Sequence, residues 1–182
     1  MRPMVVFIRH GHADGGENDR ERQLSEQGKA QVQARKEKLN GPGLFDLVII
    51  SPADRCRQTA AILAKGTGAK MVELGTLYPD PATPDGAVID KVYQKLGPQP
   101  IAAYLETEAE EALHRYGVVN KANILQLAME NDARKILVVG HAALSQMIGL
   151  MLGRSTALHN TMINEAEGFQ VNLTTHEIDL LQ

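Results

Sequence analysis

The sequence is short of three things: cysteine, long apolar runs and an excess of charge. With one cysteine in 182 residues, no disulfide can form within the chain, which is typical of a reducing cytoplasm. No apolar run approaches the roughly 20 residues that span a membrane, and the first three residues lead straight into an apolar strand without a secretory signal. A net charge of -3 gives no general attraction for nucleic acid or acidic membranes. We therefore expect a cytoplasmic protein without nucleic-acid or membrane partners.

The chain does have the composition of a globular protein. Hydrophobic residues make up 43% and charged residues 23%, unlike the composition of disordered chains. The length suits one domain with a sizeable core, and no repeat, low-complexity tract or linker interrupts it. We expect a single domain over residues 1–182.

Three apolar segments rich in β-branched residues end abruptly in polar groups. They are segments 5–8, 47–50 and 136–139, followed by Arg9-His10-Gly11, by Ser51 to Arg55 and by Gly140-His141. Segments of this kind predict buried parallel strands. In open α/β sheets, ligands bind just beyond the carboxyl ends of the strands. If the three strands are neighbours, Arg9, His10, Arg55 and His141 converge on one pocket.

Capping and periodicity predict the elements around these strands. Ser25 is suited to cap a helix that runs to about Leu39, with the Arg35 stem extending its apolar side, and segment 41–43 stops it. Segment 51–54 has the pattern of a capping box, with serine as the cap and proline at the first helical position.

The second half of the chain predicts further helices and a closing hairpin. The expected elements are a strand over 70–74, an irregular loop over 75–86, helical stripes over 101–116 and 118–129 broken at Gly117, a strand over 135–140, a helix over 142–152, and an antiparallel hairpin around 169–173 and 178–180. Together these elements predict an α/β fold, a three-layer α/β/α sandwich whose mainly parallel sheet has an antiparallel C-terminal edge.

The groups expected at the strand ends suit phosphate. Two guanidinium groups, on Arg9 and Arg55, offer fork-shaped donors to phosphoryl oxygens. Gly11 allows a close approach between ligand and backbone. The amides at the start of the helix after His141, Ala142 first, add neutral donors for an anion.

The chain resembles the histidine phosphatase superfamily, which has the phosphoglycerate-mutase-like fold. The matching motifs are Arg9-His10-Gly11, Leu24-Ser25-Glu26-Gln27-Gly28, the segment from Ser51 to Ala60 and Gly140-His141. The resemblance implies that His10 is the nucleophile, forming a phosphohistidine that water hydrolyses, and that Arg9, Arg55 and His141 hold the phosphoryl oxygens. It implies no metal or other cofactor, because the arginines supply the positive charge.

The general acid is where the sequence departs from that family. Larger members carry a carboxylic acid on the loop after the third strand, and this region offers Glu73, Asp80 and Asp85, of which Asp80 is our candidate. The altered first loop and the short chain are most similar to the SixA-type phosphohistidine phosphatases. The expected partner is then a phosphohistidine-bearing protein such as a histidine phosphotransfer domain, and the alternative is a small phosphorylated metabolite.

Other mechanisms stay open at this point. A metal-dependent hydrolase would use His10, His12 and His141 as ligands, although two arginines in the same pocket repel a cation. A cysteine phosphatase is disfavoured, because Cys56 lies within a helical pattern without an anion-cradling loop. A phosphate-binding module without catalysis, or a phosphoglycerate mutase, are further alternatives. The charged loop residues Arg20 and Arg22 are expected to be solvated or to recognise a partner.

Overall fold

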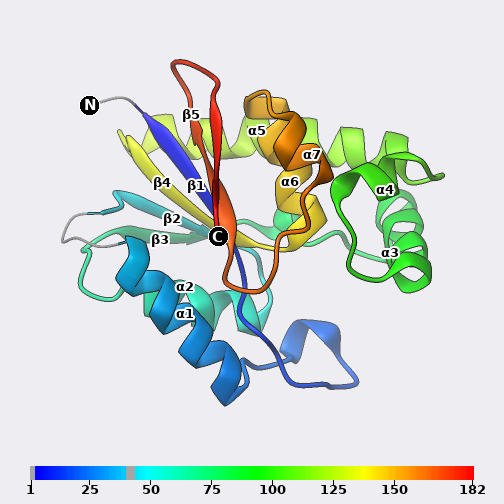
Figure 1. The fold of residues 1–182 in the computed structure, drawn as a ribbon, viewed down its shortest axis with the longest axis horizontal. Helices are drawn as coiled ribbons and strands as arrows, with labels where there is room; N and C mark the ends of the chain where they lie inside the picture. The colour runs from blue at the N-terminus through cyan, green and yellow to red at the C-terminus, as the bar shows by residue number, and fades with distance from the viewer. Residues whose placement is uncertain (1–2, 40–43) are drawn as a thin grey trace.

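The computed structural model describes residues 3–39 and 44–182. Within this part of the chain, six strands form one mixed sheet in the order β3-β2-β4-β1-β5-β6 (Figure 1). The strands are β1 (Met4–Arg9), β2 (Leu47–Ile50), β3 (Lys70–Glu73), β4 (Lys135–Gly140), β5 (Gly168–Asn172) and β6 (Ile178–Leu181). Strands β1 to β4 are parallel, while β5 runs antiparallel to β1 and β6 antiparallel to β5. The expected parallel sheet with an antiparallel C-terminal edge is confirmed.

Helices cover both faces of the sheet (Figure 1). They are α1 (Glu26–Leu39), α2 (Asp54–Ala64), α3 (Pro84–Leu96), α4 (Ile101–Leu105), α5 (Glu110–Glu130), α6 (Ala142–Leu152) and α7 (Thr156–Asn160). Alternate strand residues point to opposite faces, so Val6 and Ile8 pack with α1 and α2, while Val5 and Phe7 pack with α5, α6 and α7. These two cores make the expected three layers. Among the described helices, none is both long and apolar enough to cross a membrane.

The strand order places three strand ends side by side. Strand β4 lies between β1 and β2, with Gly140 opposite Arg9 and Val139 opposite Ile50. The chain stays paired just past the strands, because the His10 amide donates to the Gly140 carbonyl at 3.1 Å. The residues that follow the three strands therefore meet at one edge of the sheet, as parallel pairing requires.

The region between β3 and α5 differs from the sequence expectation. The expected loop over 75–86 begins with a short 3-10 helix, η2 (Gly75–Leu77), and ends inside helix α3, which begins at Pro84. The irregular part is therefore limited to residues 78–83. The Thr83 hydroxyl caps α3 by accepting a hydrogen bond from the Gly86 amide at 3.1 Å. Proline at a first helical position favours a helix start, so the proline-rich stretch that predicts a loop also contains a helix signal.

The helix break expected at Gly117 is wrong. Helix α5 continues through Gly117, and the break falls after α4, at residues 106–109. A Cβ atom at Gly117 would lie 3.0 Å from Cγ of Met147 in α6. The glycine therefore lets α5 and α6 pack closely, and this contact compensates for the low helix propensity of glycine. Helices α3 and α7 have no counterpart in the expected elements.

The two expected helix caps have different outcomes. The Ser25 hydroxyl accepts from the Gly28 amide at 3.0 Å, which confirms it as the cap of α1. The capping box at 51–54 is wrong, because α2 begins at Asp54 with Ala53 as its cap residue. The Ser51 hydroxyl bonds to a histidine of the candidate site instead. The helix stop expected at 41–43 lies outside the described residues.

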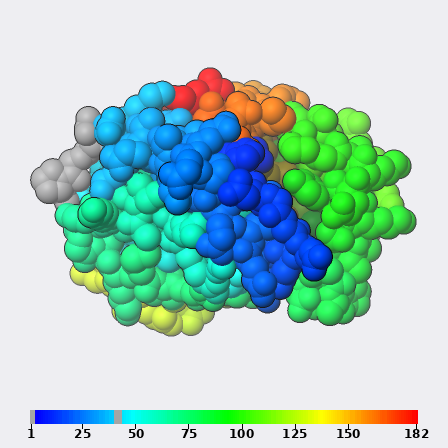
Figure 2. Space-filling view, turned by 90° about the horizontal axis from the view of Figure 1, so that it is seen from below, coloured from blue at the N-terminus to red at the C-terminus, as the bar shows by residue number. Residues whose placement is uncertain are grey.

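Two glycines bring α1 against the loop that follows β1. A Cβ atom at Gly28 would lie 2.0 Å from the His12 carbonyl oxygen, and one at Gly11 would lie 2.6 Å from the Gly28 carbonyl oxygen. Both positions therefore need glycine for packing. Figure 2 shows this loop in dark blue at the surface, facing the green surface of α3 and α4.

Candidate active site

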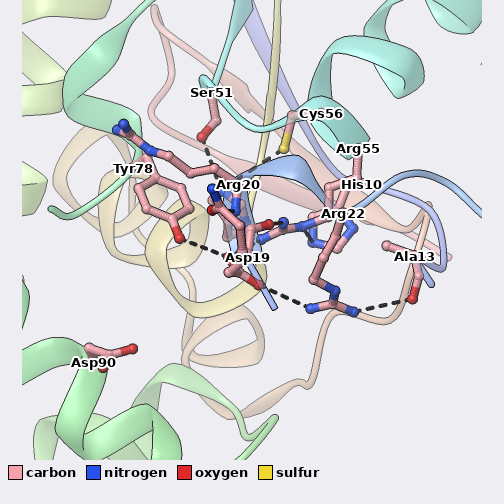
Figure 3. A network of polar contacts seen from close by, with 12 residues as sticks. His10, Ala13, Asp19, Arg20, Arg22, Ser51, Arg55, Cys56, Tyr78 and Asp90 are labelled. Atoms are coloured by element: carbon pink, nitrogen blue, oxygen red, sulfur yellow. Dashed lines mark hydrogen bonds and ion pairs between the residues drawn. The ribbon is translucent and has the colours of Figure 1, made fainter. Parts of the chain in front are cut away.

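Residues from three strand ends meet beyond the carboxyl edge of the sheet (Figure 3). His10 follows β1 and His141 follows β4, and their rings lie edge to face with centroids 5.4 Å apart. Arg55, in the first turn of α2, places Nε 3.1 Å from Nε2 of His10. Arg9 ends β1, and its charge contributes to lowering the pKa of both histidines. The sequence-predicted set is thus brought together; its catalytic roles stay predictions.

The hydrogen bonds of His10 define its tautomer. Nδ1 lies 2.8 Å from the Gly11 carbonyl oxygen, which can only accept, so Nδ1 carries the proton. Nε2 therefore presents a lone pair and accepts a hydrogen bond from Arg55. Burial, followed by the charges of His141, Arg55 and Arg9, lowers the pKa of His10 well below 6.5, while the bond to Gly11 opposes this. The result is a neutral imidazole, the form that can act as a nucleophile.

His141 is also held neutral. Its Nε2 lies 2.9 Å from the hydroxyl oxygen of Ser51. Burial and the charge of Arg55 lower its pKa to about 3, although the charge of Asp19 opposes this shift. A neutral ring at this position can hydrogen-bond an anion without carrying a charge of its own.

Cys56 lies behind the site. Its sulfur is buried, 3.9 Å from Nε2 of His141, and burial raises the pKa of the thiol to about 12. A protonated thiol is a poor nucleophile, so this environment disfavours the cysteine-phosphatase alternative. The side chain packs in the apolar core between the sheet and α2.

Sequence reasoning missed Asp19, which lies at the centre of the polar network (Figure 3). Its Oδ2 atom accepts from Nη2 of Arg55 and from the Tyr78 hydroxyl, both at 2.8 Å, and its backbone carbonyl accepts from Nη1 of Arg55. Its Oδ1 atom accepts from Arg22 at 3.1 Å. Partial burial raises the pKa of Asp19, but these hydrogen bonds and the Arg55 charge outweigh it and hold the pKa well below its ordinary value. Asp19 is therefore a permanent carboxylate.

The two loop arginines border this network. Arg22 donates to the Ala13 and Asp14 carbonyl oxygens at 3.1 and 2.8 Å as well as to Asp19, so it ties the loop together. The Arg20 guanidinium lies over the Tyr78 ring, 4.7 Å from the centroid, in the geometry of a cation–π contact.

Other candidates from the sequence lie outside the network. Asp80 caps its own turn, with Oδ1 accepting from the Ala82 amide at 2.9 Å, so its role as a general acid stays a prediction. The Gly11 amide donates to the Thr59 hydroxyl at 3.3 Å, while the Ala142 amide lies at the start of α6, where helical amides lack internal partners. Their contacts with phosphate also stay predictions.

The metal-ligand set proposed as a rival does not assemble. His12 turns toward α1, where its Nδ1 lies 2.7 Å from the Ser25 hydroxyl oxygen. Among residues 3–39 and 44–182, no three His, Cys, Asp or Glu side chains are grouped so as to hold a metal ion.

A segment from the C-terminal part of the chain supports Arg9 from behind. Nη1 of Arg9 donates to the Ile163 carbonyl oxygen at 2.9 Å, and the Ala166 amide donates to the Arg9 carbonyl oxygen at 3.2 Å. The buried Gln146 of α6 fixes the start of this segment, since its Nε2 donates to the carbonyl oxygens of Leu158 and Thr161 at 2.6 and 2.8 Å. Arg9 is therefore oriented by groups more than a hundred residues away in sequence.

Comparisons with known proteins agree with this architecture. Residues 5–78 match the family model of the histidine phosphatase superfamily, branch 1. A comparison with curated proteins finds no match to the sequence. Among solved structures, the chain is similar to SixA from Agrobacterium tumefaciens, a proposed phosphohistidine phosphatase, with 19% identity, a TM-score of 0.62 and coverage of 100% of this chain and 99% of that one.

Two further structures show the same fold with other named activities. The phosphoserine phosphatase from Entamoeba histolytica in complex with 3-phosphoglyceric acid is 17% identical, with a TM-score of 0.67 and coverage of 98% of this chain and 96% of that one. The alpha-ribazole phosphatase from Shigella flexneri is 16% identical, with a TM-score of 0.65 and coverage of 98% and 95%. The chain shares the fold of these phosphatases, which confirms the expected fold, and its first part matches the model of the expected family, the histidine phosphatase superfamily. The relatives' names differ in substrate, so the fold alone does not select one.

We expect acid to destabilise this protein through the two site histidines. The unfolded chain binds protons near the ordinary histidine pKa of about 6.5, whereas His141 resists protonation until about pH 3 and His10 until well below 6.5. Below about pH 6.5, the free energy of unfolding should therefore fall by up to about 1.4 kcal/mol per pH unit for each histidine. Urea unfolding at pH 7, 6 and 5 measures this slope.

A variant separates these histidines from other titrating groups. His141→Asn removes one of them and should roughly halve the slope between pH 7 and 5. The carboxylate of Asp19 also stabilises the fold, but its contribution is lost only as the pH falls below the ordinary aspartate range, outside this window. An unchanged slope in the variant would contradict the neutral state assigned to His141.

Proposed function

We propose that this protein is a phosphatase that works through a phosphohistidine intermediate on His10 and needs no metal ion. The observation that carries the proposal is the geometry of His10, whose protonated Nδ1 faces Gly11 and whose Nε2 lone pair faces Arg55. A neutral nucleophile beside a guanidinium suits attack on a phosphoryl group. Arg9 and His141 lie at the adjoining strand ends and complete the anion clamp.

The proposed reaction has two balanced steps. In the first, Nε2 of His10 forms a bond to phosphorus while the bond to the leaving group breaks in line, and the leaving group takes a proton from water. In the second, a water oxygen attacks phosphorus and gives up a proton to solvent, the bond to Nε2 breaks, and inorganic phosphate leaves. Arg9 and Arg55 stabilise the charge on the equatorial oxygens in both steps.

The state of the nearby carboxylate supports phosphohistidine on a partner protein as the substrate. Asp19 is the carboxylate in contact with Arg55, and its pKa is held well below the ordinary range, so it is not a proton donor. An alkoxide leaving group needs such a donor. An imidazole leaving group departs more readily, since its second ring nitrogen can take a proton from water. The likeness to SixA supports the same substrate class. The single cysteine is consistent with a cytoplasmic location.

A small phosphorylated metabolite is the second candidate. Its support is the likeness to structures described as phosphoserine and alpha-ribazole phosphatases. On this alternative an acid must protonate an alkoxide, and Asp80, on the chain before α3, is the first residue to test.

Substrate competition tests the proposal. A phosphorylated histidine phosphotransfer domain and a panel of small phosphomonoesters would be compared by kcat/KM, with chelator present and absent. We expect preference for the phosphoprotein and no effect of chelator. Faster turnover of an ester, reduced by Asp80→Asn, would establish the metabolite alternative, and loss of all activity with chelator would contradict the metal-free mechanism.

A further inference from the structure

Arg55 is a nearly buried cation that is already paired with an anion, the Asp19 carboxylate. Its side chain is 5% exposed, whereas that of its partner Asp19 is 48% exposed. All three guanidinium nitrogens are engaged, Nε with His10 and both Nη atoms with Asp19. A guanidinium at this depth is costly to leave without a counter-charge, so Asp19 stabilises it.

The atoms that hold Asp19 are the atoms that a phosphoryl group needs. Arginine binds phosphate in a bidentate fashion through such a pair of nitrogens. A phosphoryl group attacked by Nε2 of His10 must lie next to Arg55, because Nε of Arg55 is 3.1 Å from that nitrogen. A carboxylate and a phosphoryl dianion at the same guanidinium edge repel each other.

We propose that the Asp19 carboxylate competes with phosphate for Arg55, so that substrate displaces it and its return expels inorganic phosphate. The inference rests on the proposed function, because it takes Arg55 as a phosphate ligand. Asp19 becomes a residue that determines how tightly the site holds phosphate, and no proton transfer is assigned to it.

The surroundings of Asp19 suit such an exchange. It begins the short 3-10 helix η1 (Asp19–Glu21), on the loop between β1 and α1, and its side chain is half exposed. Arg22 and the Tyr78 hydroxyl also bind its carboxylate, at 3.1 and 2.8 Å. The Asp19 carboxylate therefore has hydrogen-bond partners other than Arg55. A short movement away from Arg55 leaves it paired with Arg22.

The opposite role for Asp19 makes the opposite prediction. If its carboxylate served to orient Arg55 for substrate, removing the charge would weaken phosphate binding. If it competes with phosphate, removing the charge strengthens binding. The sign of one measurement therefore decides between the two roles.

The test is the affinity for inorganic phosphate of the wild type and Asp19→Asn, measured by calorimetry at pH 7 and low salt. Asparagine keeps the shape and, with its amide oxygen in the place of Oδ2, the hydrogen bond from Tyr78, while it removes the charge and the acceptor that faces Arg22. We expect the dissociation constant to fall by about tenfold, equivalent to removing about 1.4 kcal/mol of competition. Phosphate should also become a correspondingly stronger competitive inhibitor. An unchanged or higher dissociation constant overturns the proposal.

Two further variants guard against an indirect effect of the substitution. Asp54→Asn removes a carboxylate that pairs with Arg57 rather than Arg55, and should leave phosphate affinity unchanged. Tyr78→Phe keeps the Asp19 charge but removes one of its anchors, and should strengthen phosphate binding less than Asp19→Asn does. Equal gains in Asp54→Asn and Asp19→Asn would reflect net charge alone and overturn the proposal.

Failure of the inference is distinguishable from failure of the proposed function. If Arg55→Ala binds phosphate as tightly as the wild type, Arg55 is not a phosphate ligand and both fail. If Arg55→Ala loses phosphate binding while Asp19→Asn gains none, the clamp stands and only the competition is wrong.

Discussion

Replacing His10 with asparagine is expected to reduce phosphate release by at least about 10⁴-fold, the scale of losing a catalytic nucleophile. The asparagine amide can still donate to the Gly11 carbonyl, as Nδ1 of His10 does at 2.8 Å. No atom of the variant replaces Nε2, which makes the bond to phosphorus in the proposed mechanism. Initial rates of phosphate release and the incorporation of radioactive phosphate into the protein, separated under alkaline conditions, would measure both consequences.

His12 provides the matched control. It lies two residues further along, and its Nδ1 contacts the Ser25 hydroxyl rather than a residue of the clamp. His12→Asn should keep both phosphate release and labelling of the protein. Full activity in His10→Asn would show that His10 is not the nucleophile.

Arg55→Lys is expected to lower kcat/KM by about 10³-fold, although the positive charge is kept, a loss comparable to that of other arginines that stabilise phosphoryl transfer. The guanidinium contacts His10 with Nε while its two Nη atoms face Asp19. A single ammonium group cannot occupy both positions, and it lacks the planar fork that matches two phosphoryl oxygens. Steady-state kinetics on the preferred substrate measures the loss.

An arginine on the same helix serves as the comparison. Arg57 lies two residues further along α2, is exposed, and pairs with Asp54 and Glu73 at 2.6 and 2.8 Å. Arg57→Lys should therefore leave kcat/KM nearly unchanged. If Arg55→Lys retained the wild-type value as well, the two nitrogens facing Asp19 would have no part in binding the phosphoryl group.

The parts of the fold that the sequence predicts are those with strong local signals. The apolar runs of β1, β2 and β4 are fully buried strands, and a buried strand displays its pattern in a few adjacent residues. The same signal locates His10 and His141, because each is the first polar group after its strand. Because β1 and β4 are paired in parallel, the two histidines that follow them lie at the same edge of the sheet, and no side-chain contact has to be known to predict this.

The wrong predictions arise where a tertiary contact overrides a local preference. Gly117 has a low intrinsic helix propensity, but the close contact with Met147 keeps it inside α5. Ser51 has the sequence of a helix cap, but its hydroxyl bonds to His141, so Ala53 takes the cap position. Neither contact is visible in the neighbouring sequence.

Asp19 could not have been found from sequence for the same reason. It lies in a polar loop where Asp14, Glu17 and Glu21 have similar local surroundings. Only the folded chain distinguishes it, by placing Arg55 and the Tyr78 hydroxyl on its carboxylate. Single-residue loop contacts of this kind leave no periodic signal.

The support of Arg9 by the segment after α7 has a consequence for the order of synthesis. The Ile163 carbonyl that holds Arg9 is made 154 residues after Arg9 itself. At ordinary elongation rates this gap is roughly 8 to 30 seconds. β5, which pairs with β1 and stacks Phe169 on Phe7, is translated later still. A nascent chain therefore carries Arg9, next to the proposed nucleophile His10, long before the groups that orient the Arg9 side chain have been made.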